Sequence, residues 1–482
     1  MFWRGVIGYL PVNIMQGLAG FLGIIVFTRL LPPADYGAYA LAFSVMSLAH
    51  MLSFTWLEAA MARFYTERSV AEGLPDHFTT LYRMFAWLAL ALPAPVALIL
   101  WAWPMSGALK AAIATGLASI LVRSLVKLAQ ERRRAAGDVS GAAVLDIVWT
   151  SGGFLLGAGL ALLGFGGAAP LAGPGIAAAI CLIFALPVEL RNLQGGRFRP
   201  ALAGRYFAYG APVSLSLILA LAIATTDRFV IAADLGQSSV GVYQAGYSLS
   251  SRTLDVMFIW LGMAGAPAAI AALERGGKAA LDAVAGEQSA LMVAVTLPAA
   301  VGLALVAQPL CAVMIGPALR DGAAHVTPWI AASAFFAGVT TYYLLTAFTL
   351  GRRTPLLLLS MAIPASANLV LTLVLIPRFG LQGAMWATLA SYALGAVAAY
   401  ALGRRAIPLP LPWATIGKVA VASLVMGGAV LLTPQLGGGV VELGAKAGVG
   451  VLVYGIGALA FDIAGARSRG LRLARALQLR LA

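Results

Sequence analysis

The residues of this chain most able to do chemistry are charged side chains that stand within long apolar segments. Asp227 and Arg228 are adjacent, while Arg252 and Asp255 are three residues apart and share one face if their segment is helical. A charge inside a bilayer is costly, so such residues are functional candidates by default. We predict that Arg252 binds an anionic group of a ligand and that Asp255 orients it or carries a coupling cation. The alternative is an ion pair that fixes helix packing.

The pair Asp227 and Arg228, and the single residues Arg29 and Asp146, each have two interpretations. Arg228 and Asp227 lie nearer a membrane interface, where a long side chain can extend into water, so they are either a ligand site or an anchor. Arg29 directly precedes a short loop with a proline pair and is either an interfacial anchor or a cation at the edge of a cavity. Asp146 has no cation nearby in its segment, so it is either protonated or paired with another helix. With Asp255, it is the candidate for a proton or sodium site.

Neutral polar residues and cysteines complete the candidates. Asn13 and Gln244 could bond a polar ligand or link two helices. Cys181 and Cys311 lie in or beside apolar segments without a CxxC motif or a His-rich cluster, so we expect neither a metal site nor a disulfide framework. The sequence also lacks a Walker motif and an HExxH motif. We therefore expect no cofactor and no ATP hydrolysis.

The elements that must position these residues are membrane-spanning helices. The chain has 482 residues, of which 61% are hydrophobic and only 10% charged. A soluble domain is nearer a quarter charged, so a cytoplasmic enzyme is excluded. Apolar runs of spanning length, about 20 residues each, recur throughout and predict about fourteen transmembrane helices. They lie near residues 8–30, 36–60, 78–102, 108–128, 141–164, 170–190, 206–232, 240–265, 288–308, 326–349, 355–377, 381–402, 414–433 and 445–464.

The net charge of +14, from 32 Lys+Arg against 18 Asp+Glu, reflects orientation in a membrane. With the amino terminus inside, 24 of the 32 cations fall on the inner side, as the positive-inside rule requires. We expect both termini to be cytoplasmic and no nucleic acid to bind. For Arg123 and Lys127 we expect a role in topology and in contact with anionic lipids, with recruitment of a ligand as the alternative. The eight remaining cations are Arg29, Lys110, Arg123, Arg228, Arg252, Arg320, Arg378 and Lys446.

An internal repeat organises the predicted helices. At an offset of 204 residues, Gly37 matches Gly241 and Tyr39 matches Tyr243, and each stretch opens a span after a short outer loop. A repeat of six spans is even, so both copies enter the membrane in the same direction, related by a pseudo-twofold axis along the membrane normal. This predicts two six-helix lobes enclosing a transport site, plus two extra helices. The predicted parts are residues 1–190, 191–403, 404–464 and a basic cytoplasmic tail at 465–482.

Several segments resemble the polysaccharide transporter branch of the multidrug/oligosaccharidyl-lipid/polysaccharide exporter superfamily. They include FTRLLPPADYGAYALA, WLEAAMARFYTE and NLVLTLVLIPRFGLQGAMWATLASY. The resemblance implies a flippase in a bacterial inner membrane that moves a polyprenyl-diphosphate-linked oligosaccharide to the outer leaflet. It also implies that Arg252 meets the diphosphate or an acidic sugar. Glu58 and Arg63, near the RFY string, are then expected to form a cytoplasmic gate or a first docking point.

Two other functions stay open at this stage. A drug or small-solute antiporter of the same superfamily would share the fold, although the motifs match that branch less well. A membrane-embedded polymerase or ligase would need a sizeable outer loop with catalytic residues, and the outer connections here are short. We therefore expect a transporter and no enzyme. Its expected partners are the lipid-linked oligosaccharide, membrane lipids, and a polysaccharide polymerase with glycosyltransferases.

Overall fold

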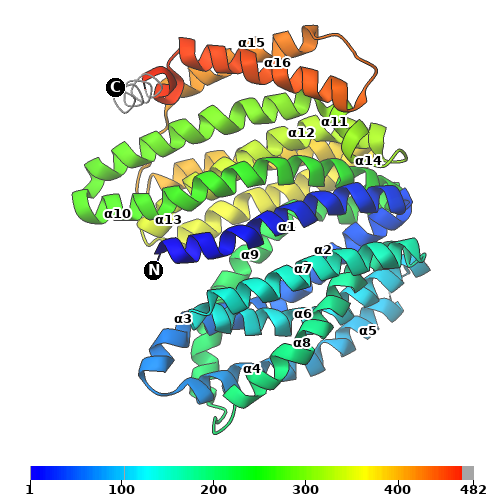
Figure 1. The fold of residues 1–482 in the computed structure, drawn as a ribbon, viewed down its shortest axis with the longest axis vertical. Helices are drawn as coiled ribbons and strands as arrows, with labels where there is room; N and C mark the ends of the chain where they lie inside the picture. The colour runs from blue at the N-terminus through cyan, green and yellow to red at the C-terminus, as the bar shows by residue number, and fades with distance from the viewer. Residues whose placement is uncertain (1, 103, 469–482) are drawn as a thin grey trace, which may run out of the picture. The chain divides into compact units, whose positions relative to one another are not determined.

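The computed structural model describes residues 2–102 and 104–468, and in this part of the chain the regular secondary structure is helical throughout (Figure 1). Clustering of the contacts divides the chain into two compact units, Met1–Val242 and Tyr243–Ala482. The helices of the first unit are α1 (Phe2–Leu30), α2 (Pro33–Ser53), α3 (Thr55–Val70), α4 (Leu74–Ala91), α5 (Pro93–Ala102), α6 (Gly107–Ala135), α7 (Val139–Leu162), η1 (Gly166–Ala168), α8 (Ala169–Asn192) and α9 (Pro200–Leu235).

The remaining helices begin at residue 237. The first turn of α10, up to Val242, still belongs to the first unit. They are α10 (Gln237–Leu305), α11 (Ala307–Met314), α12 (Arg320–Val339), η2 (Thr340–Leu344), α13 (Thr346–Leu350), α14 (Thr354–Gly403), α15 (Trp413–Leu432), α16 (Gly439–Ala460) and η3 (Ile463–Gly465). All the predicted apolar segments fall on helices, so the all-helical polytopic membrane fold expected from the sequence is confirmed.

Two of these helices are each a pair of spans joined by a tight turn. At about 1.5 Å per residue, the 69 residues of α10 would reach about 100 Å if straight, against a hydrocarbon thickness of about 30 Å. Gly277 interrupts α10 with a φ of 64°, and Gly380 interrupts α14 with a φ of 58°. Only glycine adopts this backbone region without strain. Figure 1 shows the ribbon of α10 turning back on itself.

The number of spans follows from these breaks. Ten helices of the described chain are long and apolar enough to cross a membrane, and the pair α2–α3, bent by 44°, makes eleven. Counting the halves of α10 and α14 separately and adding α1 gives about fourteen, in agreement with the segments predicted from the sequence.

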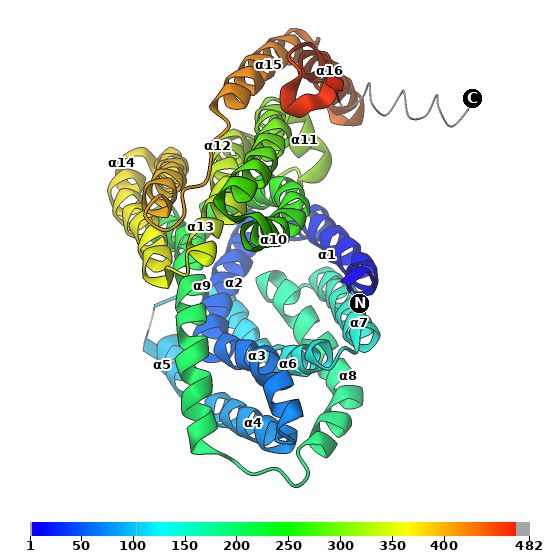
Figure 2. The same cartoon turned by 90° about the vertical axis from the view of Figure 1, so that its left-hand side faces the viewer.

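The first unit is built around α6, which contacts α2, α3, α7 and α8. α7 and α8 pack most closely because small residues face each other: a Cβ on Gly173 would overlap the backbone of Gly153 and Gly157. Small residues let transmembrane helices approach when no hydrophobic effect drives them together. Figure 2 shows α9 running beside α2 and α3, with which it packs.

A crossing of α2 with the first turns of α10 is also part of the first unit. A Cβ on Gly37 would overlap the carbonyl oxygen of Gln237, and a Cβ on Gly241 would overlap the carbonyl oxygen of Pro33. These are the residues that the 204-residue offset matches, so the contact is reciprocal, as a twofold axis through the crossing would require. The lobe boundaries at residues 190 and 403 stay a prediction.

The second unit has its core between α10, α12, η2 and α14. Phe258, Tyr343 and Phe348 are among its largest fully buried side chains. α15 and α16 pack against each other and expose large apolar side chains, such as Leu424 and Val451. Such exposure is expected of helices that face lipid.

Candidate functional site

A stripe of charged residues along α6 forms the polar interior of the first unit. Arg123, Lys127, Glu131 and Arg134 follow one another at intervals of four, four and three residues. This spacing places them on one face of the helix. Side chains from α2, α3 and α7 meet this face, and carboxylates of other helices pair with Lys127 and Arg134.

Glu58 lies where α2, α3 and α6 meet. It follows the bend at Phe54 between α2 and α3 by one turn and is buried. Its carboxylate lies 3.5 Å from Lys127 Nζ and 3.2 Å from His50 Nε2. His50 Nδ1 in turn lies 2.9 Å from Ser124 Oγ. The sequence grouped Glu58 with Arg63, but the structure does not bring them together.

Arg63 is exposed on the following turn of α3, with its guanidinium 5.8 Å from the centre of the Phe64 ring. Glu58 therefore faces the helix bundle while Arg63 faces outward. A common role for the two as a gate stays a prediction.

Asp146 has a cation from another helix. Its carboxylate accepts a hydrogen bond from Arg134 Nη2 at 3.2 Å and one from Gln16 Nε2 at 3.0 Å. Asp146 is 3% exposed, so this pair offsets the cost of burying its charge. Of the two alternatives left by the sequence, pairing with another helix is the one observed. An ion-coupling role stays a prediction.

Asp227 and Arg228 are buried where α9 packs on α2. Arg228 Nη1 donates to Ser44 Oγ at 3.3 Å, and the Asp227 carboxylate accepts from the Arg228 backbone N–H at 2.8 Å. Arg29 is exposed and donates to the Ile25 carbonyl one turn earlier on α1. Asp227 and Arg228 are thus packed between helices, whereas Arg29 is exposed at the end of α1.

In the second unit, Arg252 and Asp255 are both exposed on α10. Neither forms a hydrogen bond or an ion pair with any residue that the structure describes. The i,i+3 spacing predicted a shared face, and both side chains are accessible there, but the helix-packing ion pair is not formed. Gln244 donates to Ser248 Oγ on its own helix at 2.6 Å. The side chain of Asn13 lies outside the described residues.

The sequence favoured a role in topology for Arg123, with recruitment of a ligand as the alternative. Arg123 is partly buried on α6, its Nη1 lies 3.1 Å from Met46 Sδ, and its guanidinium is 5.5 Å from the centre of the Trp149 ring. A signal was present in the sequence: no acidic residue stands three or four positions from Arg123.

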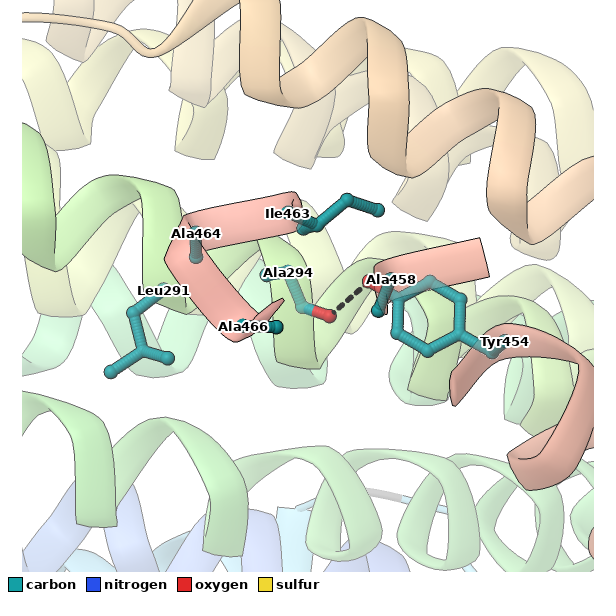
Figure 3. Close-up of a pocket in the computed structure, with 7 residues that line it drawn as sticks. All are labelled: Leu291, Ala294, Tyr454, Ala458, Ile463, Ala464 and Ala466. Atoms are coloured by element: carbon teal, nitrogen blue, oxygen red, sulfur yellow. Dashed lines mark hydrogen bonds between the residues drawn. The ribbon is translucent and has the colours of Figure 1, made fainter. Parts of the chain in front are cut away.

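An apolar pocket of about 240 Å³ lies in the second unit, between the second half of α10, α16 and η3 (Figure 3). The lining residues carry no charge, and the Tyr454 hydroxyl is already bonded to the Ala294 carbonyl at 2.6 Å. The pocket therefore offers nothing to a charged or sugar headgroup. Its lining residues are Leu291, Ala294, Tyr454, Ala458, Ile463, Ala464 and Ala466.

Metal binding finds no geometric support in the described part of the chain. Cys181 and Cys311 are both buried and unbonded to each other. Within residues 2–102 and 104–468, no group of three or more His, Cys, Asp or Glu side chains is placed to hold a metal ion.

Comparison with known proteins places these features in a family. The model of the family described as "polysaccharide biosynthesis protein" matches residues 26–321. No curated protein matches the sequence. Among solved structures, the lipid II flippase MurJ in an inward closed conformation aligns with a TM-score of 0.74 at 14% identity, covering 94% of this chain and 98% of that one.

Other transporters share the fold as well. An inward-facing multidrug resistance MATE family transporter aligns with a TM-score of 0.67 at 15% identity, covering 83% of this chain and 97% of that one. A transporter from Pyrococcus furiosus described as having a binding pocket of reversed polarity aligns with a TM-score of 0.52 at 13% identity, over 83% and 92% of the two chains. At these identities the likenesses show the fold alone.

Proposed function

Since this chain belongs to the polysaccharide biosynthesis protein family, we propose that it is a flippase for a polyprenyl-diphosphate-linked oligosaccharide. The proposed cargo is the repeat unit of an exopolysaccharide, a capsule or an O-antigen, moved from the cytoplasmic to the periplasmic leaflet of a bacterial inner membrane. Both termini are then cytoplasmic. A polysaccharide polymerase and glycosyltransferases are the proposed protein partners, and the chain itself carries out no catalysis.

The observation that carries this proposal is that Arg252 is exposed on α10 without an anionic partner among the described residues. It is an exposed cation within an apolar segment, and it has no anionic partner within 4.0 Å among the described residues. Such a position is costly unless an anion binds there during the work of the protein. A guanidinium can hold a phosphate or a carboxylate through two parallel hydrogen bonds. Asp255, three residues on, would orient it or bind a coupling cation.

Alternating access is the proposed mechanism. The headgroup enters from the cytoplasm between two lobes, at residues 1–190 and 191–403, which rock and then open outward. The reciprocal glycine crossing of α2 and α10 gives the lobes a close contact about which to turn. A diphosphate leaving a negative interior gains up to about 5 kcal/mol per 100 mV, at roughly 2.3 kcal/mol per charge. A coupling ion at Asp146 or Asp255 would add to this driving free energy.

The test is export in a strain that lacks the gene. Cells complemented with wild type, Arg252→Lys, Arg252→Ala and Arg252→Glu are compared, with Arg405→Ala as the control because Arg405 is exposed in the loop after α14. The lipid-linked glycan should accumulate in the inner leaflet with the Ala and Glu variants, and less so with the Lys variant. Normal export by membrane-inserted Arg252→Ala and Arg252→Glu would refute the assigned cationic site.

A drug or small-solute antiporter is the second candidate, favoured only by the fold shared with the MATE transporter. Proteoliposomes separate the two functions. Transport of cationic dyes by purified protein that leaves polyprenyl diphosphates in place would establish the antiporter instead of the flippase.

A further inference from the structure

Arg123 is the deep cation of α6 for which the fold supplies no carboxylate. Sixteen residues separate it from Gly107 at the start of the helix, which corresponds to about 24 Å along the axis. Nearer the other end of α6, Lys127 lies 3.5 Å from Glu58, Arg132 lies 2.6 Å from Glu189 and Arg134 lies 3.2 Å from Asp146. Arg123 has no such contact with any residue that the structure describes.

Uncharged groups hold the Arg123 guanidinium in place instead. Met46 Sδ, a weak acceptor, lies 3.1 Å from Nη1. The Trp149 ring lies 5.5 Å from the guanidinium carbon, within the range of a cation–π interaction. The indole is itself fixed, because Trp149 Nε1 donates to the Pro174 carbonyl at 3.0 Å. The cation is therefore positioned without being neutralised.

Most hydrogen-bond donors of Arg123 are still available. A guanidinium has five N–H groups, and Met46 is the partner of one nitrogen. None of the Arg123 nitrogens is among the fully buried polar atoms that lack a hydrogen-bond partner, so its unbonded nitrogens are not completely enclosed by the protein. A partly buried cation with accessible donors is suited to an oxyanion, since the planar fork matches the geometry of a phosphate or a carboxylate.

We propose that Arg123 binds an oxyanion of the transported molecule within the first unit. The inference rests on the proposed flippase function and assigns a second anion-binding residue, on a different helix from Arg252. The oxyanion is either the diphosphate of the lipid carrier or the carboxylate of an acidic sugar. The neighbouring carboxylates Glu58 and Asp146 are engaged by Lys127 and Arg134, which leaves the charge of Arg123 for the ligand.

The experiment measures binding to full-length purified protein in detergent. The probes are decaprenyl diphosphate, a decaprenyl glucuronide that lacks phosphate, and uncharged decaprenol. Wild type, Arg123→Gln and Arg123→Lys are compared, with Arg133→Gln as the matched control on the same helix. For one of the charged probes, Arg123→Gln should lose at least about tenfold in affinity, as expected for hydrogen bonds to a charged group.

The pattern of losses identifies the source of the oxyanion. Loss for the diphosphate alone assigns Arg123 to the carrier, and loss for the glucuronide alone assigns it to the sugar. The Lys variant should retain part of the affinity, while decaprenol binding and the Arg133→Gln protein should not change. Arg123→Met, which keeps the packing on Met46 and Trp149, replaces the Gln variant if the latter fails to fold.

Two different failures are distinguishable. Unchanged affinity of Arg123→Gln and Arg123→Met for both charged probes would overturn the oxyanion site and leave the flippase function standing. Failure of the wild-type protein to move a lipid-linked glycan in proteoliposomes would overturn the function. An Arg123-dependent preference for charged probes would still support the site in that case.

Discussion

The charges of the first unit and those of α10 in the second unit differ in how they are neutralised. In the first unit, buried Glu58, Asp146 and Glu189 each have a cation from another helix. On α10, Arg252 and Asp255 are neighbours on one face and still form no ion pair. An accessible pair gains little from contact and loses side-chain entropy, whereas a buried carboxylate without a partner is very costly. Sequence spacing alone therefore does not predict which charges are paired, and the buried carboxylates are the ones for which pairing matters most to stability.

The largest test of this difference is removal of Glu189. It is 1% exposed and accepts hydrogen bonds from Arg132 at 2.6 and 2.8 Å and from Tyr82 at 2.9 Å. Glu189→Ala should lower the free energy of unfolding by about 3–5 kcal/mol, because it leaves the Arg132 charge uncompensated. Thermal unfolding in detergent measures this. Arg132→Met in the same protein should restore part of the loss, and the absence of any rescue would argue against the pair.

Asp146 should give the next largest effect. Asp146→Asn keeps its size and one acceptor for Gln16 Nε2 but removes the charge that faces Arg134. We expect a loss of about 1–3 kcal/mol in the free energy of unfolding. The loss should be smaller than for Glu189 because Arg134 also contacts Glu131 at 2.7 Å. Unfolding curves that match the wild type would show that the contact contributes nothing.

An exposed pair on the second half of α10 provides the contrast. Lys278 and Asp282 form an i,i+4 ion pair, and both side chains are more than two-fifths exposed. Lys278→Ala should change the free energy of unfolding by only about 0.3–0.5 kcal/mol. High salt should remove even this difference, since exposed pairs are screened. A loss comparable to that for Glu189→Ala would contradict the expected difference between exposed and buried ion pairs.

Arg252 should have the smallest effect on stability and a large one on export. Since Arg252 has no partner to lose among the described residues, Arg252→Ala should unfold within about 0.5 kcal/mol of the wild type, as other exposed substitutions do. Export measured on the same variant should nevertheless fall. A strongly destabilised Arg252→Ala protein would indicate a packing role instead of a ligand-binding one.

The elements of this fold could be predicted from the sequence because the membrane imposes a local rule. Each span needs about 20 apolar residues with all its backbone groups bonded internally, and this composition is visible in any window of the chain. The glycines at 37 and 241 could likewise be matched by their offset. Their reciprocal contact could not, because it depends on how two helices approach each other.

The candidate site was predicted less completely. Their shared position near the RFY string grouped Glu58 with Arg63, whereas the partners of Glu58 are Lys127 and His50. It also left Asp146 without a cation, and Arg134 on the neighbouring helix provides one. Arg123 was assigned to topology together with Lys127, although only Lys127 is paired. Each difference arises because the partner belongs to a helix that spacing along one segment cannot reveal.

The sequence by itself determined that the chain is a multi-pass helical membrane protein, how many spans it has to within a small margin, and which charges lie inside them. These properties follow from composition along each segment, since transfer into a bilayer is a sum over local residues. Only the tertiary structure decided which of those charges are neutralised. Pairing depends on distances of a few ångströms between side chains of different helices, and among the described residues it gives Lys127 and Arg134 a carboxylate from another helix but gives none to Arg123 or Arg252.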